Sequence, residues 1–163
     1  MSVKLLRIDS RLVHGQITTN WVKSLNVQQV IVMSDELTPD SLQYKMMKAV
    51  VPHWLQLTVV NAEQMEFLLQ EERFHELETM IVVETVEDAV RIFDLGLKLS
   101  TVNIGSLKFQ LGKKMVTDAV AINQDDVQAF QKLHQKNINL EIRKVFQDKP
   151  KDLWKILQDK QFV

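Results

Sequence analysis

The sequence contains no cysteine and few glycines and prolines, four and three respectively among its 163 residues. The lack of cysteine excludes disulfides, thiolate nucleophiles and zinc sites with cysteine ligands, and it agrees with a reducing compartment. Low glycine and proline, with 45% apolar and 25% charged residues, are typical of a folded chain rather than a disordered one. This length predicts a single domain over residues 1–163.

The sequence also lacks an excess of one charge and any long apolar run. Its 20 basic and 21 acidic side chains give a net charge of -1, which predicts neither nucleic acid nor an anionic membrane surface as a partner. No apolar stretch approaches the roughly 20 residues that span a bilayer, and the N-terminus lacks the apolar core of a signal peptide. We therefore expect a cytoplasmic protein with no direct membrane insertion.

Short apolar runs rich in β-branched residues alternate with longer segments of helical period. The runs lie at residues 3–8, 30–33, 55–60, 80–83 and 101–104. This alternation predicts an α/β fold with a doubly wound, mainly parallel open sheet and helices on both faces. Residues 105–122 predict a loop and an antiparallel edge strand, residues 139–145 a last strand, and residues 147–163 a terminal amphipathic helix.

Polar side chains that favour helix starts precede several of the helical segments. Thr38 followed by Pro39 predicts an N-cap and the first position of a helix. Three further caps are predicted at Asn61, Thr85 and Asn123.

The segment RIDSRLVHGQ directly follows the first predicted strand. Ligands of open α/β sheets bind outside the carboxyl ends of the strands, so this position favours a function. The start of the next helix, the permanently charged Arg11 and the small Gly15 suit a phosphate group. Arg7 and Asp9 fall on one face of the strand, where Asp9 could orient an arginine or fix the tautomer of His14.

His14 has a structural interpretation beside the chemical ones. In the structural interpretation, the neighbouring charges form an ion-pair cluster and His14 is a polar residue at a helix start. Neither the H-x-x-x-H nor the H-E-x-x-H metal spacing occurs, and the G-x-S-x-G turn of a serine hydrolase is absent as well. Nucleophilic phosphoryl transfer through a phosphohistidine uses all the residues present. No metal and no other cofactor is expected.

Other polar clusters carry weaker signals. The glycines of GSLKFQLGKK are seven positions apart rather than five, and Lys114 stands where a P-loop has serine or threonine. Ser34 and Asp35 end the second predicted strand and could line the crevice in support of the site, although acids before a capped helix are more often simply solvated. The remaining histidines have no cluster and are expected at the surface: His53, His75 and His134.

The chain resembles the IIB component of the mannose/fructose/sorbose class of the bacterial phosphoenolpyruvate-dependent sugar phosphotransferase system. The match is strongest in RIDSRLVHGQITTNW and continues through VIVMSDEL, TVNIG, VQAFQKL and LEIRKV in the same order. The resemblance implies a phosphocarrier and a protein-Nπ-phosphohistidine–sugar phosphotransferase subunit. His14 would accept a phosphoryl group on Nδ1 from a IIA phosphohistidine and pass it to a sugar.

The resemblance also implies partners and supporting residues. The partners are a IIA component as phosphoryl donor, the membrane IIC and IID components with which the protein is peripherally associated, and a sugar of the mannose, fructose, sorbose or N-acetylgalactosamine class. Asp9, Arg11, Gly15 and Gln16 would bind or orient the phosphoryl group. Apart from the resemblance, the place of Arg7 on the strand makes it a candidate for a supporting role. The sequence leaves open which sugar is carried and whether the chain forms a homo-oligomer.

Two segments depart from the family pattern. Members often have a second glycine followed by methionine where this chain has Ser106-Leu107, and Thr-Asn-Pro where it has Glu84-Thr85-Val86. Both follow predicted strands that could border the crevice, so they bear on partner docking or on the choice of sugar pathway.

Two other functions stay open on the sequence. A histidine phosphatase or mutase also groups Arg, His and Gly, but Leu12 and Val13 separate Arg11 from His14 here. A non-catalytic regulatory domain of the same fold would keep the segment without its chemistry.

Overall fold

The computed structural model describes residues 3–163 and is built on one large sheet. Its strands are β1 (Val3–Asp9), β2 (Gln29–Met33), β3 (Gln56–Val60), β4 (Thr79–Val83), β5 (Thr101–Ser106), β8 (Asn139–Ile142) and β9 (Lys151–Asp152). The strand order is β3-β2-β4-β1-β5-β8-β9. All neighbours pair in parallel except β9, which runs antiparallel to β8. The predicted α/β sheet with an antiparallel edge strand is confirmed.

The location of that edge strand differs from the prediction. Residues 105 and 106 complete β5, and the rest of the segment leaves the main sheet and contains a separate antiparallel pair, β6 (Lys114–Met115) and β7 (Ala121–Ile122). Buried Leu107, Val116 and Val120 fix this segment by apolar contacts instead of by pairing at the edge. The strand predicted over residues 139–145 is confirmed as β8 (Asn139–Ile142), but it is not the last one, because β9 (Lys151–Asp152) follows it.

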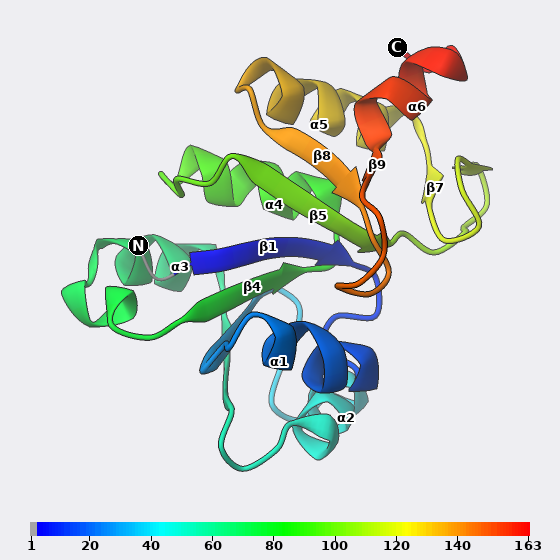
Figure 1. Cartoon of the computed structure of the whole chain (residues 1–163). Coiled ribbons are helices and arrows are strands. Elements are labelled where there is room, and N and C mark those ends of the chain that lie inside the picture. The colour runs from blue at the N-terminus through cyan, green and yellow to red at the C-terminus, as the bar shows by residue number, and fades with distance from the viewer. Residues whose placement is uncertain (1–2) are drawn as a thin grey trace.

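Helices cover both faces of the sheet (Figure 1). A π-helical turn, Ile17–Trp21, leads into α1 (Val22–Ser24), and α2 (Leu42–Val50) packs beside them on one face. The other face carries α3 (Ala62–Gln70), a short 3-10 helix (Glu72–His75), α4 (Val86–Asp94), α5 (Gln124–Gln135) and α6 (Leu153–Asp159). Among the described helices, none combines the length and the apolar character that a membrane span requires.

Three of the four predicted helix caps are confirmed. Their side chains each accept a hydrogen bond from the backbone N–H three positions on: Asn61, Thr85 and Asn123. The prediction for Thr38 and Pro39 is wrong, because the cap of α2 is Ser41, whose Oγ accepts from the N–H of Tyr44 at 3.2 Å. The Thr38 carbonyl instead accepts from the N–H of Ser41 in a turn before the helix.

β1 is the central strand and positions the candidate site. Its neighbours are β4 and β5, and its alternate side chains enter the two apolar cores, Leu6 and Ile8 on one face and Leu5 on the other. The chain leaves β1 toward α1 on one face and leaves β4 toward α4 on the opposite face. The carboxyl ends of these two strands therefore form the switch point where open α/β sheets bind ligands.

Candidate functional site

The turn after β1 carries a bulky residue in a left-handed conformation. Leu12 has φ +54°, its side chain is fully buried, and its N–H donates to the Asp9 carbonyl at 2.9 Å. This conformation costs an L-residue roughly 1–2 kcal/mol, so the burial of the side chain must hold it. The turn reverses the chain and brings His14 back beside the end of β1.

The Asp9 carboxylate is the centre of the site. Its Oδ2 lies 3.1 Å from Nε2 of His14 and accepts from Nη2 of Arg7 at 3.0 Å. Its Oδ1 accepts from the backbone N–H of Arg11 at 3.0 Å and from Oγ of Ser106 at 2.9 Å. The structure thus joins Arg7, Asp9, Arg11 and His14, which the sequence placed in one segment, and adds Ser106 from β5.

The charge of Asp9 fixes the proton on the His14 ring. Burial acts to raise the pKa of the Asp9 carboxyl, but the hydrogen bond to His14, the charge of Arg7 and the hydrogen bonds from Arg11 outweigh it. They hold this pKa far below its usual range, and an ionised carboxylate only accepts hydrogen bonds. The proton must therefore lie on Nε2, and no hydrogen bond from within residues 3–163 reaches Nδ1.

Arg11 stands at the mouth of the site. Its guanidinium Nε and Nη2 donate to Asp9 at 3.2 and 3.4 Å, while 52% of the side chain stays exposed. The His14 side chain beside it is 19% exposed. A permanent cation next to an accessible ring nitrogen can contact an anionic group that approaches the imidazole.

Gly15 and Gln16 begin the helical segment after His14. The hydroxyls of Thr18 and Thr19 donate to the Gly15 carbonyl at 3.1 and 2.7 Å. A Cβ added to Gly15 would meet nothing within 4 Å, so no internal packing demands glycine at this position. The space outside Gly15 is open to an approaching molecule, and Gln16 is half-buried beside it.

Ser34 and Asp35 are bound to other partners. The Ser34 Oγ accepts from the N–H groups of Glu36 and Leu37 at 3.3 and 3.2 Å. Asp35 accepts from the N–H of Ala62 at 3.1 Å and from Arg91 at 2.7 Å. The Ser34 bonds stay within the turn after β2, whereas those of Asp35 join this turn to α3 and α4. The structure does not bring Ser34 or Asp35 into the Asp9 cluster.

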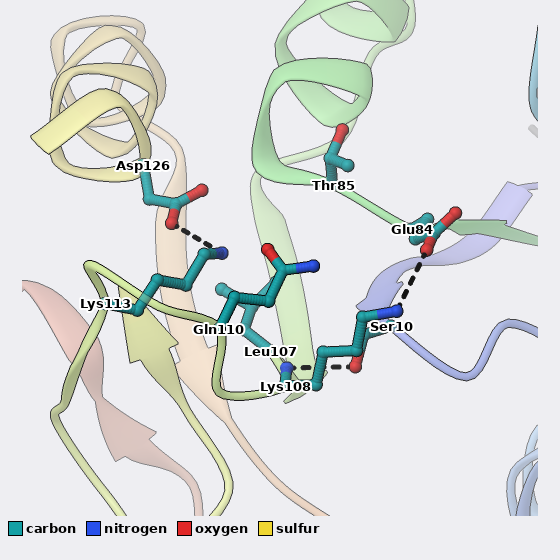
Figure 2. A pocket seen from close by; sticks show the side chains of 8 residues that line it. All are labelled: Ser10, Glu84, Thr85, Leu107, Lys108, Gln110, Lys113 and Asp126. Atoms are coloured by element: carbon teal, nitrogen blue, oxygen red, sulfur yellow. Dashed lines mark hydrogen bonds and ion pairs between the residues drawn. The ribbon is translucent and has the colours of Figure 1, made fainter. Parts of the chain in front are cut away.

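Sequence reasoning missed the serines that complete the cluster. Ser106 Oγ lies 3.1 Å from Ser10 Oγ, which accepts from the N–H of Lys108 at 3.1 Å. The two segments that depart from the family pattern meet in the small cavity beyond them, where Lys108 reaches toward Glu84 (Figure 2). The cavity is lined by Ser10, Glu84, Thr85, Leu107, Lys108, Gln110, Lys113 and Asp126. The departure at Ser106 was the only sequence signal for its role.

The other histidines are at the surface, as predicted: His53, His75 and His134. His134 stacks on Trp154 with 3.9 Å between ring centroids, far along the chain from the His14 segment. In the part of the chain that the structure describes, no three histidine, aspartate or glutamate side chains are grouped to hold a metal ion.

Comparison with known proteins places the fold and the His14 segment in one family. The PTS system sorbose subfamily IIB component family matches over residues 3–163, and the chain belongs to that family. It is 30% identical over 159 residues to the fructose-specific EIIB component of Bacillus subtilis, covering 98% of each chain. The IIBSor domain of the sorbose permease from Klebsiella pneumoniae superposes with a TM-score of 0.93 at 28% identity, covering 100% of each chain.

A longer relative also matches. The chain is 35% identical over 148 residues to the mannose-specific EIIAB component of Escherichia coli. The match covers 91% of this chain and 46% of that protein, so the chain spans about half the length of this relative. The resemblance seen in the sequence is confirmed at the level of the family, a group of sugar phosphotransferase system subunits, and the matches favour neither a phosphatase or mutase nor a regulatory domain.

Proposed function

We propose that the protein is a phosphocarrier in which Nδ1 of His14 receives a phosphoryl group from a IIA phosphohistidine and delivers it to a sugar. The observation that carries this proposal is the 3.1 Å contact between Nε2 of His14 and the buried Asp9 carboxylate. Because that carboxylate accepts a hydrogen bond from Nε2–H, the neutral ring presents its lone pair at Nδ1.

The transfer needs no redox step and no metal. The Nδ1 lone pair attacks phosphorus, the bond from phosphorus to the donor nitrogen breaks, and its electron pair returns to the donor ring. Asp9 stabilises the positive charge that the His14 ring gains, and Arg11 contacts the phosphoryl oxygens. In the second transfer a sugar hydroxyl oxygen attacks phosphorus, the bond to Nδ1 breaks, and the hydroxyl proton leaves to the acceptor site or to water.

Membership of the family supports a proposal for the partners of this protein. IIB components work with a IIA component and with membrane IIC and IID components, and relatives of this chain are named for mannose, fructose and sorbose. We assign the sugar to that class and the place of work to the cytoplasmic side of the membrane, beside IIC and IID. One phosphohistidine must meet a donor and then an acceptor, so both use the face around His14 and compete for it.

Phosphorylation of the purified protein tests the proposal. Labelled phosphoenolpyruvate, the general carriers and the cognate IIA component should load one acid-labile, base-stable phosphoryl group, and nitrogen NMR should locate it on Nδ1 of His14. His14→Asn should abolish the label, and the matched control His53→Asn, at an exposed position, should keep it. The label should return to IIA when the carriers run backwards.

Two outcomes contradict the proposal. A label on another side chain, or full labelling of His14→Asn, would remove His14 from the reaction. Turnover of free phosphate esters by the isolated protein would favour a phosphatase or mutase.

A further inference from the structure

Arg7 is a buried cation with all of its donors used. Its side chain is 0% exposed. Nε and Nη2 donate to Oδ2 of Asp9 at 3.2 and 3.0 Å, and Nη1 donates to Oδ1 of Asn103 at 2.5 Å. The remaining two N–H groups donate to the carbonyls of Arg143 and Lys144 at 3.0 and 3.2 Å. A guanidinium has five N–H groups, so its orientation is fully determined here.

The space for this guanidinium exists because residue 105 is glycine. A Cβ on Gly105 would lie 2.0 Å from Nη2, 2.2 Å from Cζ and 2.6 Å from Nε of Arg7. The Trp21 ring lies against the guanidinium, with 5.0 Å from its centroid to Cζ. Trp21 is itself held by a 3.0 Å hydrogen bond from its Nε1 to the Lys144 carbonyl. Gly105 and Trp21 therefore enclose the space that the Arg7 guanidinium occupies.

The charges around Asp9 explain what Arg7 does. Besides Arg7, the carboxylate faces the half-exposed Arg11, the His14 ring and the neutral Ser106 hydroxyl. Arg7 is thus its only fully buried cation. A buried carboxylate that loses its cation tends to take up a proton or to turn toward water. Either change would remove the acceptor that keeps the proton on Nε2 of His14.

Arg143 and Glu141 are the other charges near Arg7. Arg143 pairs with Glu141 at 2.6 Å, and Glu141 also accepts from the Asn103 amide at 3.2 Å. Glu141 thus compensates Arg143 and bonds Asn103, and Asp9 remains the only carboxylate bonded to Arg7 among residues 3–163.

We propose that Arg7 is a positioning residue, seated by Gly105, which keeps Asp9 ionised and oriented and thereby holds His14 in its Nε2–H tautomer. Arg7 does not touch the phosphoryl group. This inference rests on the proposed function of His14, but its central claim concerns the unphosphorylated ring.

Nitrogen NMR of the His14 ring tests the proposal on the unphosphorylated protein. The wild-type neutral ring should be in the Nε2–H form. Arg7→Met should give a mixture of the two tautomers, and Gly105→Ala should do the same without removing any charge, because its Cβ displaces the guanidinium. Arg91→Met is the matched control, since it removes an arginine whose two carboxylate partners, Asp35 and Asp88, are not bonded to His14 or Asp9, and it should leave the tautomer unchanged.

The rate of phosphorylation gives a second readout. Arg7→Met should slow the acceptance of phosphate about 100-fold, the size of a small misplacement of a reacting group. It should also add an acidic limb to the pH profile, because the pKa of Asp9 rises when Arg7 is lost and activity then falls as Asp9 becomes protonated. Arg7→Lys should restore the rate in part, since one ammonium has three N–H groups and cannot replace the five hydrogen bonds of the guanidinium.

A purely structural role predicts another pattern. If folded Arg7→Met and Gly105→Ala lose thermal stability but keep the Nε2–H tautomer and the wild-type pH profile, the proposal is overturned. Should Arg7→Met not fold, Gly105→Ala and Arg7→Lys decide by the same two measurements. Failure of the wild type to accept phosphate would refute the proposed function, while the tautomer result would still stand or fall by itself.

Discussion

Two aspartates stand at the same edge of the sheet, Asp9 at the end of β1 and Asp35 shortly after β2. Each accepts hydrogen bonds from an arginine side chain and from a backbone N–H. The Asp9 side chain is 0% exposed and the Asp35 side chain 47% exposed. The same residue types at equivalent places in the fold therefore lie in different surroundings.

The difference shows how the carboxylate of the candidate site differs from an ordinary surface carboxylate. The pKa of Asp35 is lowered by the hydrogen bonds from Arg91 and from the Ala62 N–H, in contact with water. The pKa of Asp9 is lowered against the opposing effect of burial. Exposed ion pairs contribute little, whereas a buried carboxylate must have its partners in place and so dictates where a neighbouring ring carries its proton. A lowered pKa alone does not mark the site.

Replacing each aspartate by asparagine should give the largest difference in effect between the two regions. Asp9→Asn leaves Arg7 buried without its counterion, so the free energy of unfolding should fall by about 3–5 kcal/mol. Phosphoryl acceptance by His14 should fall by about four orders of magnitude, as when the aspartate that orients a catalytic histidine is replaced. Asp35→Asn should alter neither. Urea unfolding and labelling rates measure both, and equal effects at the two positions would erase the distinction.

Replacing the arginine of each region by alanine should affect the phosphorylation rate differently, while neither replacement should change the thermal stability much. Arg11→Ala should slow phosphorylation by about 10²–10³-fold, the usual cost of losing a donor to a developing charge. Its thermal midpoint should hardly move, because half of the side chain is exposed. Arg91→Ala is the matched control and should leave the rate unchanged. A normal rate in Arg11→Ala would show that Arg11 only supports Asp9.

The stability of the two regions should also respond differently to acid. The folded-state pKa of Asp9 lies below its unfolded value of about 3.9, so its stabilisation is present above about pH 4 and is lost as the pH falls through the folded-state pKa. The gap in unfolding free energy between wild type and Asp9→Asn should hence be constant near neutrality and narrow in acid. Added salt should weaken the ion pair of the exposed Asp35 far more than the ion pairs of the buried Asp9. A gap that widens in acid would contradict the assignment.

Replacing the serine of each region by alanine should give the smallest difference in phosphorylation rate. Ser106→Ala removes one hydrogen bond to Asp9 and should reduce the phosphorylation rate by several-fold, equivalent to about 1 kcal/mol. Ser34→Ala removes bonds within a surface turn and should leave the rate unchanged. An unaffected phosphorylation rate in Ser106→Ala would show that Ser106 has only a structural role.

Much of the fold could be predicted from the sequence because its signals are local. Apolar β-branched runs mark the five strands β1 to β5, and the side chains of Asn61, Thr85 and Asn123 cap helices within their own segments. The segment from Arg7 to His14 likewise carries most of the cluster in sequence order. β9 could not be foreseen, because two charged residues at an edge leave no apolar pattern.

The rest of the site depends on contacts between distant segments. Ser106 reaches Asp9 across 97 positions, and no local pattern announces that contact. The burial of Arg7 depends on the absent side chain of Gly105, which from the sequence was one glycine of a failed P-loop match. The left-handed Leu12 is held by the core rather than by its own preference.

The long reach of Arg7 determines when the site can exist during synthesis. Its acceptors lie 2, 96, 136 and 137 positions further along the chain. At about 5–20 residues per second, the Lys144 carbonyl is made roughly 7–27 seconds after Arg7. Until Arg143 and Lys144 are made, Arg7 lacks two of its acceptors, although β4 and β5, the neighbours of β1 in the sheet, already exist. A translation product that ends before residue 144 therefore carries the whole His14 segment without the complete set of acceptors for Arg7.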